Sequence, residues 1–333
     1  MGTQDAKARR LADTMTHPGP CLAQTGVDPV YLGIEIGGSK LQMVTGNARG
    51  EIFERWKFPV QPQAGAPAIR AQIESALRTL DTSAMAGLGA GFGGPVDHRT
   101  GRIACSHQIE GWSDFDLRGW LSDLTGLPAA VENDANTAAL GEALLGGGRS
   151  LDPAFYVTLG SGVGGGLVCQ GRIYHGAPPG EAEIGHLRLD RQGTIVEERC
   201  SGWAVNRSIR EAVAASPNGP LALRVTQDPG HEARHLRPAL DQNDDTARRI
   251  LAATTDDLAF ALSHVTHLLH PAVIILGGGL AQVGEPLRAA VAERLPSWLM
   301  TVFRPGPAVV LAVLGEDAVP AGALLLAATE QST

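Results

Sequence analysis

The feature that most constrains this chain is a strand that enters a glycine-rich turn and returns as a second strand, a device that occurs twice. In the first copy the apolar run Val30 to Ile36 enters the turn Gly37-Gly38-Ser39-Lys40. In the second, Phe155 to Thr158 enters Gly160 to Gly166, which holds five glycines, more than a tight hairpin needs. Such turns present backbone N–H groups to a phosphate without side-chain obstruction. The repetition indicates an internal duplication, with two related domains facing each other across a cleft that can hold a triphosphate.

Composition narrows the class of protein. The chain has 333 residues, 44% of them hydrophobic, which is enough for two domains of ordinary size. Its net charge of -8 argues against a nucleic-acid partner, and residues 1–29, a polar tail with at most a short helix near Ala6 to Met15, are too short for a helix-turn-helix domain. We find no membrane-spanning run and no signal peptide. The four cysteines lack C-x-x-C spacing, which favours reduced thiols and a cytoplasmic location.

The stretch between the two devices carries a candidate catalytic group. Ala129 to Val131 is a short apolar run and Ala135 to Leu145 has a helical pattern, so Asn133 and Asp134 lie where a strand passes into a helix. Ligands bind at that edge in open α/β sheets. Asp134 could cap the helix, or it could accept a proton from a substrate hydroxyl. An isolated Asn-Asp pair favours the cap, but the neighbouring glycine turns favour chemistry.

Other segments yield coarser predictions. Trp112 is expected to be exposed in a polar loop, and residues 216–245, rich in Pro, Asn, Asp and Gly, are expected to form an irregular connection. A strand at Val273 to Leu276 opens into Gly277-Gly278-Gly279, which suits a nucleotide's base or α-phosphate, with plain helix packing as the alternative. Helices are predicted at Ala68 to Leu80, Leu117 to Leu124, Asp245 to Leu269 and Ala318 to Thr329.

Glu183 and His186 are three residues apart and share a face if that segment is helical or a tight turn. The pair could be half of a metal site, a hydroxyl-binding pair, or a solvated surface pair. Zinc would need further ligands, and only Cys200 is near in sequence.

Six motifs in order give the chain a family resemblance over about residues 30 to 328. They are Gly33-Ile34-Glu35-Ile36-Gly37-Gly38-Ser39-Lys40, Gly93-Gly94-Pro95-Val96-Asp97, Val131-Glu132-Asn133-Asp134-Ala135-Asn136, Thr158 to Gly166, Glu183-Ile184-Gly185-His186 and Ile275-Leu276-Gly277-Gly278-Gly279. With these motifs the chain resembles the ROK family of sugar kinases and repressors. The resemblance implies an α/β, actin/hexokinase-like (ribonuclease H-like) duplicated two-domain fold with an interdomain cleft. The tail is then 1–29, the smaller domain 30–136 plus 317–333, and the larger domain 137–316.

The same resemblance implies an ATP-dependent kinase that transfers the γ-phosphoryl group to a hexose hydroxyl, with Mg²⁺ and with Asp134 as the base. Glu35 would lie near the Mg²⁺, through water. The sugar would be bound by Gly94, Asn133, Asp134, Glu183, His186 and Glu197. The nucleotide would be bound by Glu35, Gly37, Gly38, Ser39, Lys40, Gly160, Ser161, Gly162, Gly277, Gly278 and Gly279.

The chain departs from the family pattern at three points. Glu35 stands where many members have Asp, and Ser39 stands where many have Thr. The C-x-C-G-x-x-G-C zinc loop is missing between His186 and Ser201-Gly202, so zinc is not expected. By the resemblance, the family's next sugar-contacting Glu falls on Glu197 if Ser201-Gly202 is the matching Ser-Gly pair. Glu198 is the alternative if the alignment is shifted by one residue.

Two other functions stay open. A non-catalytic sugar-sensing protein would share the fold, although the net charge and the short N-terminal tail count against DNA binding. A polyphosphate-dependent glucokinase would also fit, although no basic track for a long polyanion is visible. The identity of the sugar is not readable from the sequence, and a homodimer is expected from the resemblance.

Overall fold

A computed structural model describes residues 28–329 apart from 39, 106–109, 179 and 181, and it contains two five-stranded sheets of the same topology. Their strand orders are β3-β2-β1-β4-β8 and β11-β10-β9-β12-β13. In both, three antiparallel strands are extended by two parallel ones. The predicted duplication is therefore present in the topology. The strands are β1 (Val30–Ile36), β2 (Leu41–Gly46), β3 (Ile52–Phe58), β4 (Met85–Phe92), β8 (Ala129–Asn133), β9 (Ala154–Leu159), β10 (Val163–Cys169), β11 (Arg172–Ile173), β12 (Val273–Gly277) and β13 (Ala308–Leu311).

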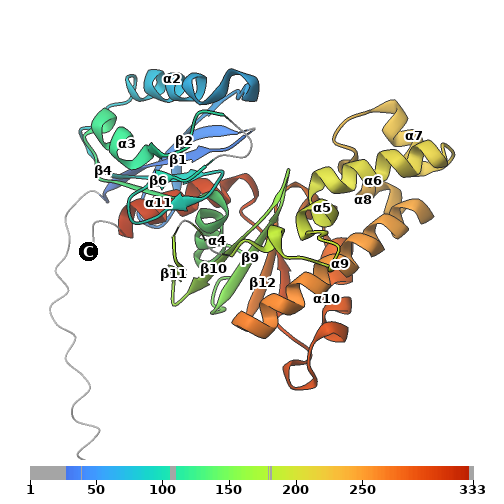
Figure 1. Cartoon of the computed structure of the whole chain (residues 1–333). Coiled ribbons are helices and arrows are strands. Elements are labelled where there is room, and N and C mark those ends of the chain that lie inside the picture. The colour runs from blue at the N-terminus through green and yellow to red at the C-terminus, as the bar shows by residue number, and fades with distance from the viewer. Residues whose placement is uncertain (1–27, 39, 106–109, 179, 181, 330–333) are drawn as a thin grey trace, which may run out of the picture.

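The first sheet is covered on both faces (Figure 1). Helices α2 (Gly65–Leu77) and α3 (Leu117–Thr125) bury their apolar stripes on one face, and α11 (Ala318–Thr329) packs on the other. A small sheet of β5 (Val96–Asp97), β6 (Arg102–Ile103) and β7 (Phe115–Asp116) extends this half.

The prediction that Trp112 is exposed was wrong, because its side chain is only 1% exposed. Its ring meets Phe92 and Phe115 edge to face, with centroid distances of 5.3 Å in both cases, and the Arg70 guanidinium lies over it. The polar residues around Trp112 in sequence hid this aromatic cluster, which forms only when α2, β4 and β7 pack together.

The second sheet lies between α4 (Asp134–Leu144) and a larger group of helices, seen in yellow and orange in Figure 1. That group contains α5 (Val196–Cys200), α6 (Gly202–Ala215), α9 (Asp245–Leu269) and α10 (Glu285–Trp298). Two short 3-10 helices follow strands of this sheet. η2 (Ile184–His186) comes after the loop that follows β11, and η4 (Gly279–Val283) comes almost directly after β12.

Residues 216–245 are not an irregular connection, which corrects the prediction. They form α7 (Pro220–Gln227), η3 (Glu232–His235) and α8 (Leu236–Asp241). The turn-forming residues that suggested a loop lie at helix starts: Pro220 opens α7, and Asp244 caps the next helix, α9, by accepting from Ala247 N. Between them Leu221, Val225 and Leu236 are buried in the core.

Helix α4 links the two sheets. It contacts β9 and β10 and crosses α11, the last helix, closely through glycines. A Cβ at Gly141 would lie 2.5 Å from Ala318 O, and one at Gly322 would lie 1.9 Å from Thr137 O. The predicted boundary after residue 136 falls within α4, and the division into domains stays a prediction.

The helices predicted at Asp245 to Leu269 and Ala318 to Thr329 have these bounds in the structure, and the others differ at their ends. Ser39 and the short helix expected near Ala6 to Met15 lie outside the described residues. Within the described part of the chain, no helix combines the length and the apolar character needed to span a bilayer.

Candidate active site

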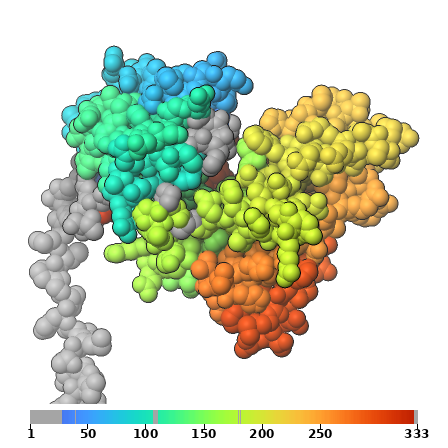
Figure 2. Space-filling model, in the orientation of Figure 1, coloured from blue at the N-terminus to red at the C-terminus, as the bar shows by residue number. Residues whose placement is uncertain are grey.

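Residues from both halves of the chain line one cavity of about 830 Å³. They come from the β1–β2 turn, the loop after β4, the start of α4, the β9–β10 turn, and the segments around η2, α5 and the start of α6. In Figure 2 the surface is hollowed between the blue and teal half and the yellow half. Of the predicted site residues, the cavity is lined by Glu35, Gly37, Gly38, Lys40, Gly94, Asn133, Asp134, Gly160, Ser161, Gly162, Glu183, His186 and Glu197.

Asp134 is the first residue of α4, and Asn133 caps this helix. Asn133 Oδ1 accepts from Ala135 N at 2.9 Å and from Asn136 N at 3.2 Å. Asn133 and not Asp134 is therefore the N-cap residue, and Asp134 lines the cavity while the backbone N–H groups of Ala135 and Asp134 bond to its carboxylate. A Cβ at Gly93 would lie 3.4 Å from both Asp134 Oδ2 and Gly37 Cα, so the loop after β4 lies beside the β1–β2 turn and the start of α4.

The surroundings of Asp134 shift its protonation. Burial, together with the negative charges of Glu35 and Glu183, raises the pKa of Asp134 to about 7 from an ordinary 3.8. Backbone N–H groups at the start of α4 oppose the shift but do not cancel it. A carboxylate with this pKa can take a proton near neutral pH, as a general base requires.

Glu35 is held from the neighbouring strands. It lies opposite Gln42 in the β1–β2 pair and accepts a hydrogen bond from Gln42 Nε2. Gln42 Oε1 accepts from Arg55 Nη1 at 2.9 Å, and Arg55 is paired with Asp317. Burial raises the pKa of Glu35, against the hydrogen bond from Gln42 and the charge of Lys40. This partly buried polar chain depends on strand register, so no local sequence pattern predicts it.

Glu183, His186 and Glu197 lie on the side of the cavity formed by η2 and α5. Glu183 Oε2 is 3.7 Å from His186 Nδ1, and both side chains are at least half exposed. Glu197 Oε2 accepts from Val163 N at 2.9 Å, which joins α5 to the β9–β10 turn. Glu198, the alternative to Glu197, instead accepts from Ile195 N and does not line the cavity.

Asn133 has little free hydrogen-bonding capacity. Besides the two bonds to its Oδ1, its Nδ2 donates to Gly94 O at 3.0 Å. The side chain thus ties the loop after β4 to the start of α4. Its contact with a sugar stays a prediction.

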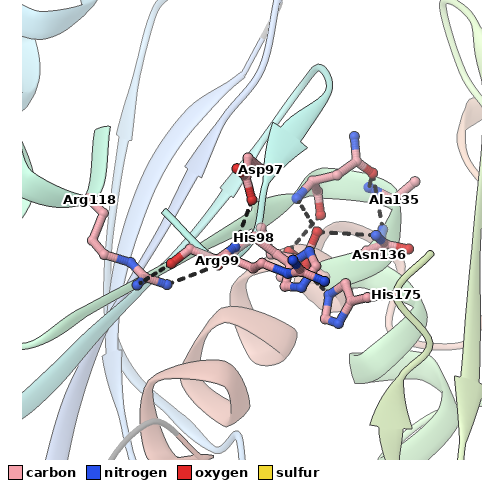
Figure 3. A network of polar contacts seen from close by, with 10 residues as sticks. Asp97, His98, Arg99, Arg118, Ala135, Asn136 and His175 are labelled. Carbon is pink, nitrogen blue, oxygen red and sulfur yellow. Dashed lines mark hydrogen bonds and ion pairs between the residues drawn. The ribbon is translucent and has the colours of Figure 1, made fainter. Parts of the chain in front are cut away.

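A buried network supports the strand that leads to Asp134 (Figure 3). Glu132, 2% exposed, accepts from Asn133 N at 2.7 Å and from Asn136 Nδ2 at 3.1 Å, and it contacts His175 Nε2 at 2.5 Å. His175 in turn stacks on His98, with ring centroids 3.8 Å apart. Sequence reasoning noted Glu132 only as a neighbour of Asp134.

Gly277, Gly278 and Gly279 do not line the cavity. Gly278 has φ +79°, and a Cβ there would lie 2.6 Å from the backbone of Leu159, directly before Gly160. Gly278 therefore lies against the end of β9, next to the β9–β10 turn. Trp203, which sequence reasoning missed, does line the cavity and is 63% exposed.

The charge lining the cavity is mainly negative. Its described lining residues include one Lys or Arg, Lys40, and four carboxylates, those of Glu35, Asp134, Glu183 and Glu197. An all-oxygen acidic set of this kind suits Mg²⁺, a hard cation that favours carboxylates and phosphates. Among the described residues, no group of three or more His, Cys, Asp or Glu is arranged to hold a metal by itself. Cys200 Sγ is buried and lies 3.6 Å from Thr254 O.

Comparisons with known proteins agree with this geometry. The model of the ROK family matches residues 31–330. A glucokinase from Halalkalibacterium halodurans is 31% identical over 87% of this chain and 92% of its own length, and one from Thermotoga maritima is 30% identical over 86% and 93%. The crystal structure of a ROK family glucokinase from Streptomyces griseus, in complex with glucose and AMPPNP, superposes with a TM-score of 0.78. The two chains are 28% identical, and the superposition covers 90% of this chain and 99% of the other.

Proposed function

The chain belongs to the ROK family, and from this premise and the geometry of the cleft we propose that it is an ATP-dependent sugar kinase that phosphorylates a hexose hydroxyl. The family and the actin/hexokinase-like fold predicted from the motifs are thereby confirmed. Glucose is the first sugar to test, because the relatives at about 30% identity are glucokinases.

One observation carries the proposal. Asp134, Glu183 and Gly160 line a single cavity although they come from α4, the loop after β11 and the β9–β10 turn. A base, a hydroxyl-binding carboxylate and a phosphate-binding turn are the parts that phosphoryl transfer to an alcohol requires. A structural role for each of these residues would not require them to converge.

The reaction follows from these positions. Glu183, His186 and Glu197 orient the sugar, and the N–H groups of the glycine turns bind the phosphate oxygens. Asp134 takes the proton of the attacking hydroxyl while the sugar oxygen bonds to the γ-phosphorus and the bond from that phosphorus to the β,γ-bridging oxygen breaks. ADP and the sugar phosphate are the products. Mg²⁺, held beside the phosphates with Glu35 nearby, would neutralise charge on the donor.

Three further points are part of the proposal. Mg²⁺ is supported by the carboxylates that line the cavity. A cytoplasmic location is supported by the cysteines, since Cys169 and Cys200 are free thiols. A homodimer is expected from the family resemblance.

The direct test is a coupled assay of the full chain with ATP or polyphosphate as donor. The sugars are glucose, fructose, mannose, allose, glucosamine, N-acetylglucosamine and N-acetylmannosamine. We expect ATP-dependent phosphorylation of at least one hexose. Sugar binding with no turnover for either donor would instead support a non-catalytic sugar-sensing protein. Activity with polyphosphate alone would support a polyphosphate-dependent glucokinase.

A further inference from the structure

Trp203 is a large apolar side chain exposed in the cleft. It lies in the first turn of α6, lines the same cavity as Asp134 and Gly160, and is 63% exposed. No Phe or Tyr, and no other Trp, lines this cavity among the described residues. Large exposed aromatic faces in binding clefts commonly contact flat or apolar parts of ligands.

The backbone fixes Trp203 beside the predicted phosphate-binding turn. Gly202 N, directly before it, donates to Gly160 O at 2.7 Å. A Cβ at Gly202 would lie 2.8 Å from that oxygen, so a glycine is needed for α6 to begin this close to the turn. Ser201 secures the helix start by accepting from Ala204 N at 3.1 Å. The backbone position of Trp203, one residue from the bond to Gly160, is therefore fixed.

The orientation of a bound donor follows from what surrounds the turn. On one side, a Cβ at Gly164 would lie 3.1 Å from Ala135 Cβ, so the start of α4 and Asp134 lie there. The phosphate to be transferred must face Asp134. Elsewhere around the turn, Gly278 lies against Leu159, and Gly202, directly before Trp203, bonds to Gly160. The end of the donor remote from the transferred phosphate thus leads toward the region of Trp203 and Gly278.

The sugar is a poorer match for this side chain. The groups proposed to orient it are polar, and Glu197 meets the turn at Val163 rather than at Gly160. A nucleotide base, in contrast, has a flat π face that stacks on aromatic rings. We propose that Trp203 is the surface on which the base of the donor nucleotide stacks, so that it favours ATP over donors without a base. This inference rests on the proposed kinase function.

The test compares Trp203→Ala with wild type for two ligands, AMPPNP and tripolyphosphate, by titration calorimetry with Mg²⁺. Both ligands carry a triphosphate-like chain, but only AMPPNP has a base. We expect the Kd for AMPPNP to rise about tenfold, the loss of one base–aromatic stack, and the Kd for tripolyphosphate to stay within about twofold of wild type, since no stack is lost. Trp203→Phe should retain most of the affinity for AMPPNP.

Trp298→Ala is the matched control, because Trp298 is also exposed but lies at the end of α10, away from the cavity. It should leave both affinities unchanged. Equal losses for AMPPNP and tripolyphosphate, an effect on glucose binding alone, or no effect of Trp203→Ala would each overturn the stacking role. Binding is measured without turnover, so the result stands apart from whether the chain phosphorylates a hexose.

Discussion

Gln42 lies directly across from Glu35 in the β1–β2 pair and donates its side-chain amide to the Glu35 carboxylate. The same amide nitrogen donates to Glu316 O at 3.2 Å, and its oxygen accepts from Arg55. Gln42 thus joins a carboxylate of the cleft to the segment that leads from the second sheet into α11. Gln42 is 3% exposed, so its hydrogen bonds cannot be replaced by water without rearrangement.

We predict that Gln42→Leu lowers the free energy of unfolding by roughly 1–3 kcal/mol, because Glu35 and Arg55 are left with unmet hydrogen bonds. Lys57→Ala is the control: Lys57 lies opposite Gln42 on β3 and pairs with Glu316, but both side chains of this ion pair are more than half exposed. Its effect should be below about 0.5 kcal/mol. Urea unfolding of both variants measures these free energies. If both substitutions lower the free energy of unfolding equally, the hydrogen bonds of Gln42 do not stabilise the fold in the way proposed.

The raised pKa of Asp134 predicts an opposite pH dependence for activity and for stability. The kcat/KM of the enzyme should rise with pH and level off above about 7, as the free base forms. Because the folded-state pKa lies above the ordinary 3.8, Asp134 favours the folded state at low pH, and this contribution is lost as pH rises from about 4 to about 7.

Asp134→Asn removes that titration. Its free energy of unfolding should match wild type near pH 4 and exceed it by on the order of a few kcal/mol at pH 8, where wild type buries a charge. Denaturant unfolding at the two pH values measures the difference. A constant difference across this range would mean that Asp134 titrates at its ordinary value.

The buried network at Glu132 predicts a loss of both stability and turnover in Glu132→Ala. Two N–H groups and His175 lose their partner, so we expect a cost of roughly 2–4 kcal/mol in unfolding free energy. A lower kcat is also expected, because the start of α4 is no longer held. Glu54→Ala, at an exposed position on β3, is the matched control for the change of residue type. If the two variants behave alike, the network does not support the site.

Gly278 and Gly279 give a matched pair of glycine substitutions. Gly278→Ala should cost roughly 1–3 kcal/mol, because its φ is positive and the new methyl group would meet the Leu159 backbone. Gly279→Ala should be near neutral, since nothing lies within 4 Å of its Cβ position. Thermal unfolding distinguishes them. A raised KM for ATP in Gly278→Ala alone is also expected, through displacement of Leu159 and Gly160.

Much of the fold could be predicted because the relevant patterns are local. The 3.6-residue repeat of Asp245 to Leu269 and the apolar run of Ala318 to Thr329 gave helices with the observed bounds, and the two glycine turns indicated the duplication. Trp112 and residues 216–245 were misjudged because polar and turn-forming neighbours concealed apolar positions that only tertiary packing buries. The partners of Glu35 and the exposure of Trp203 depend on strand register and on segments far apart in sequence.

The measurement that tests the central claim most directly is phosphoryl transfer from ATP to the accepted hexose by wild type and Asp134→Asn, alongside the Kd for that sugar. The cleft geometry predicts a Kd close to wild type and a kcat lower by about a hundredfold or more, the usual contribution of a general base. If the Asn variant binds the sugar and keeps more than about a tenth of wild-type turnover, Asp134 is not the base.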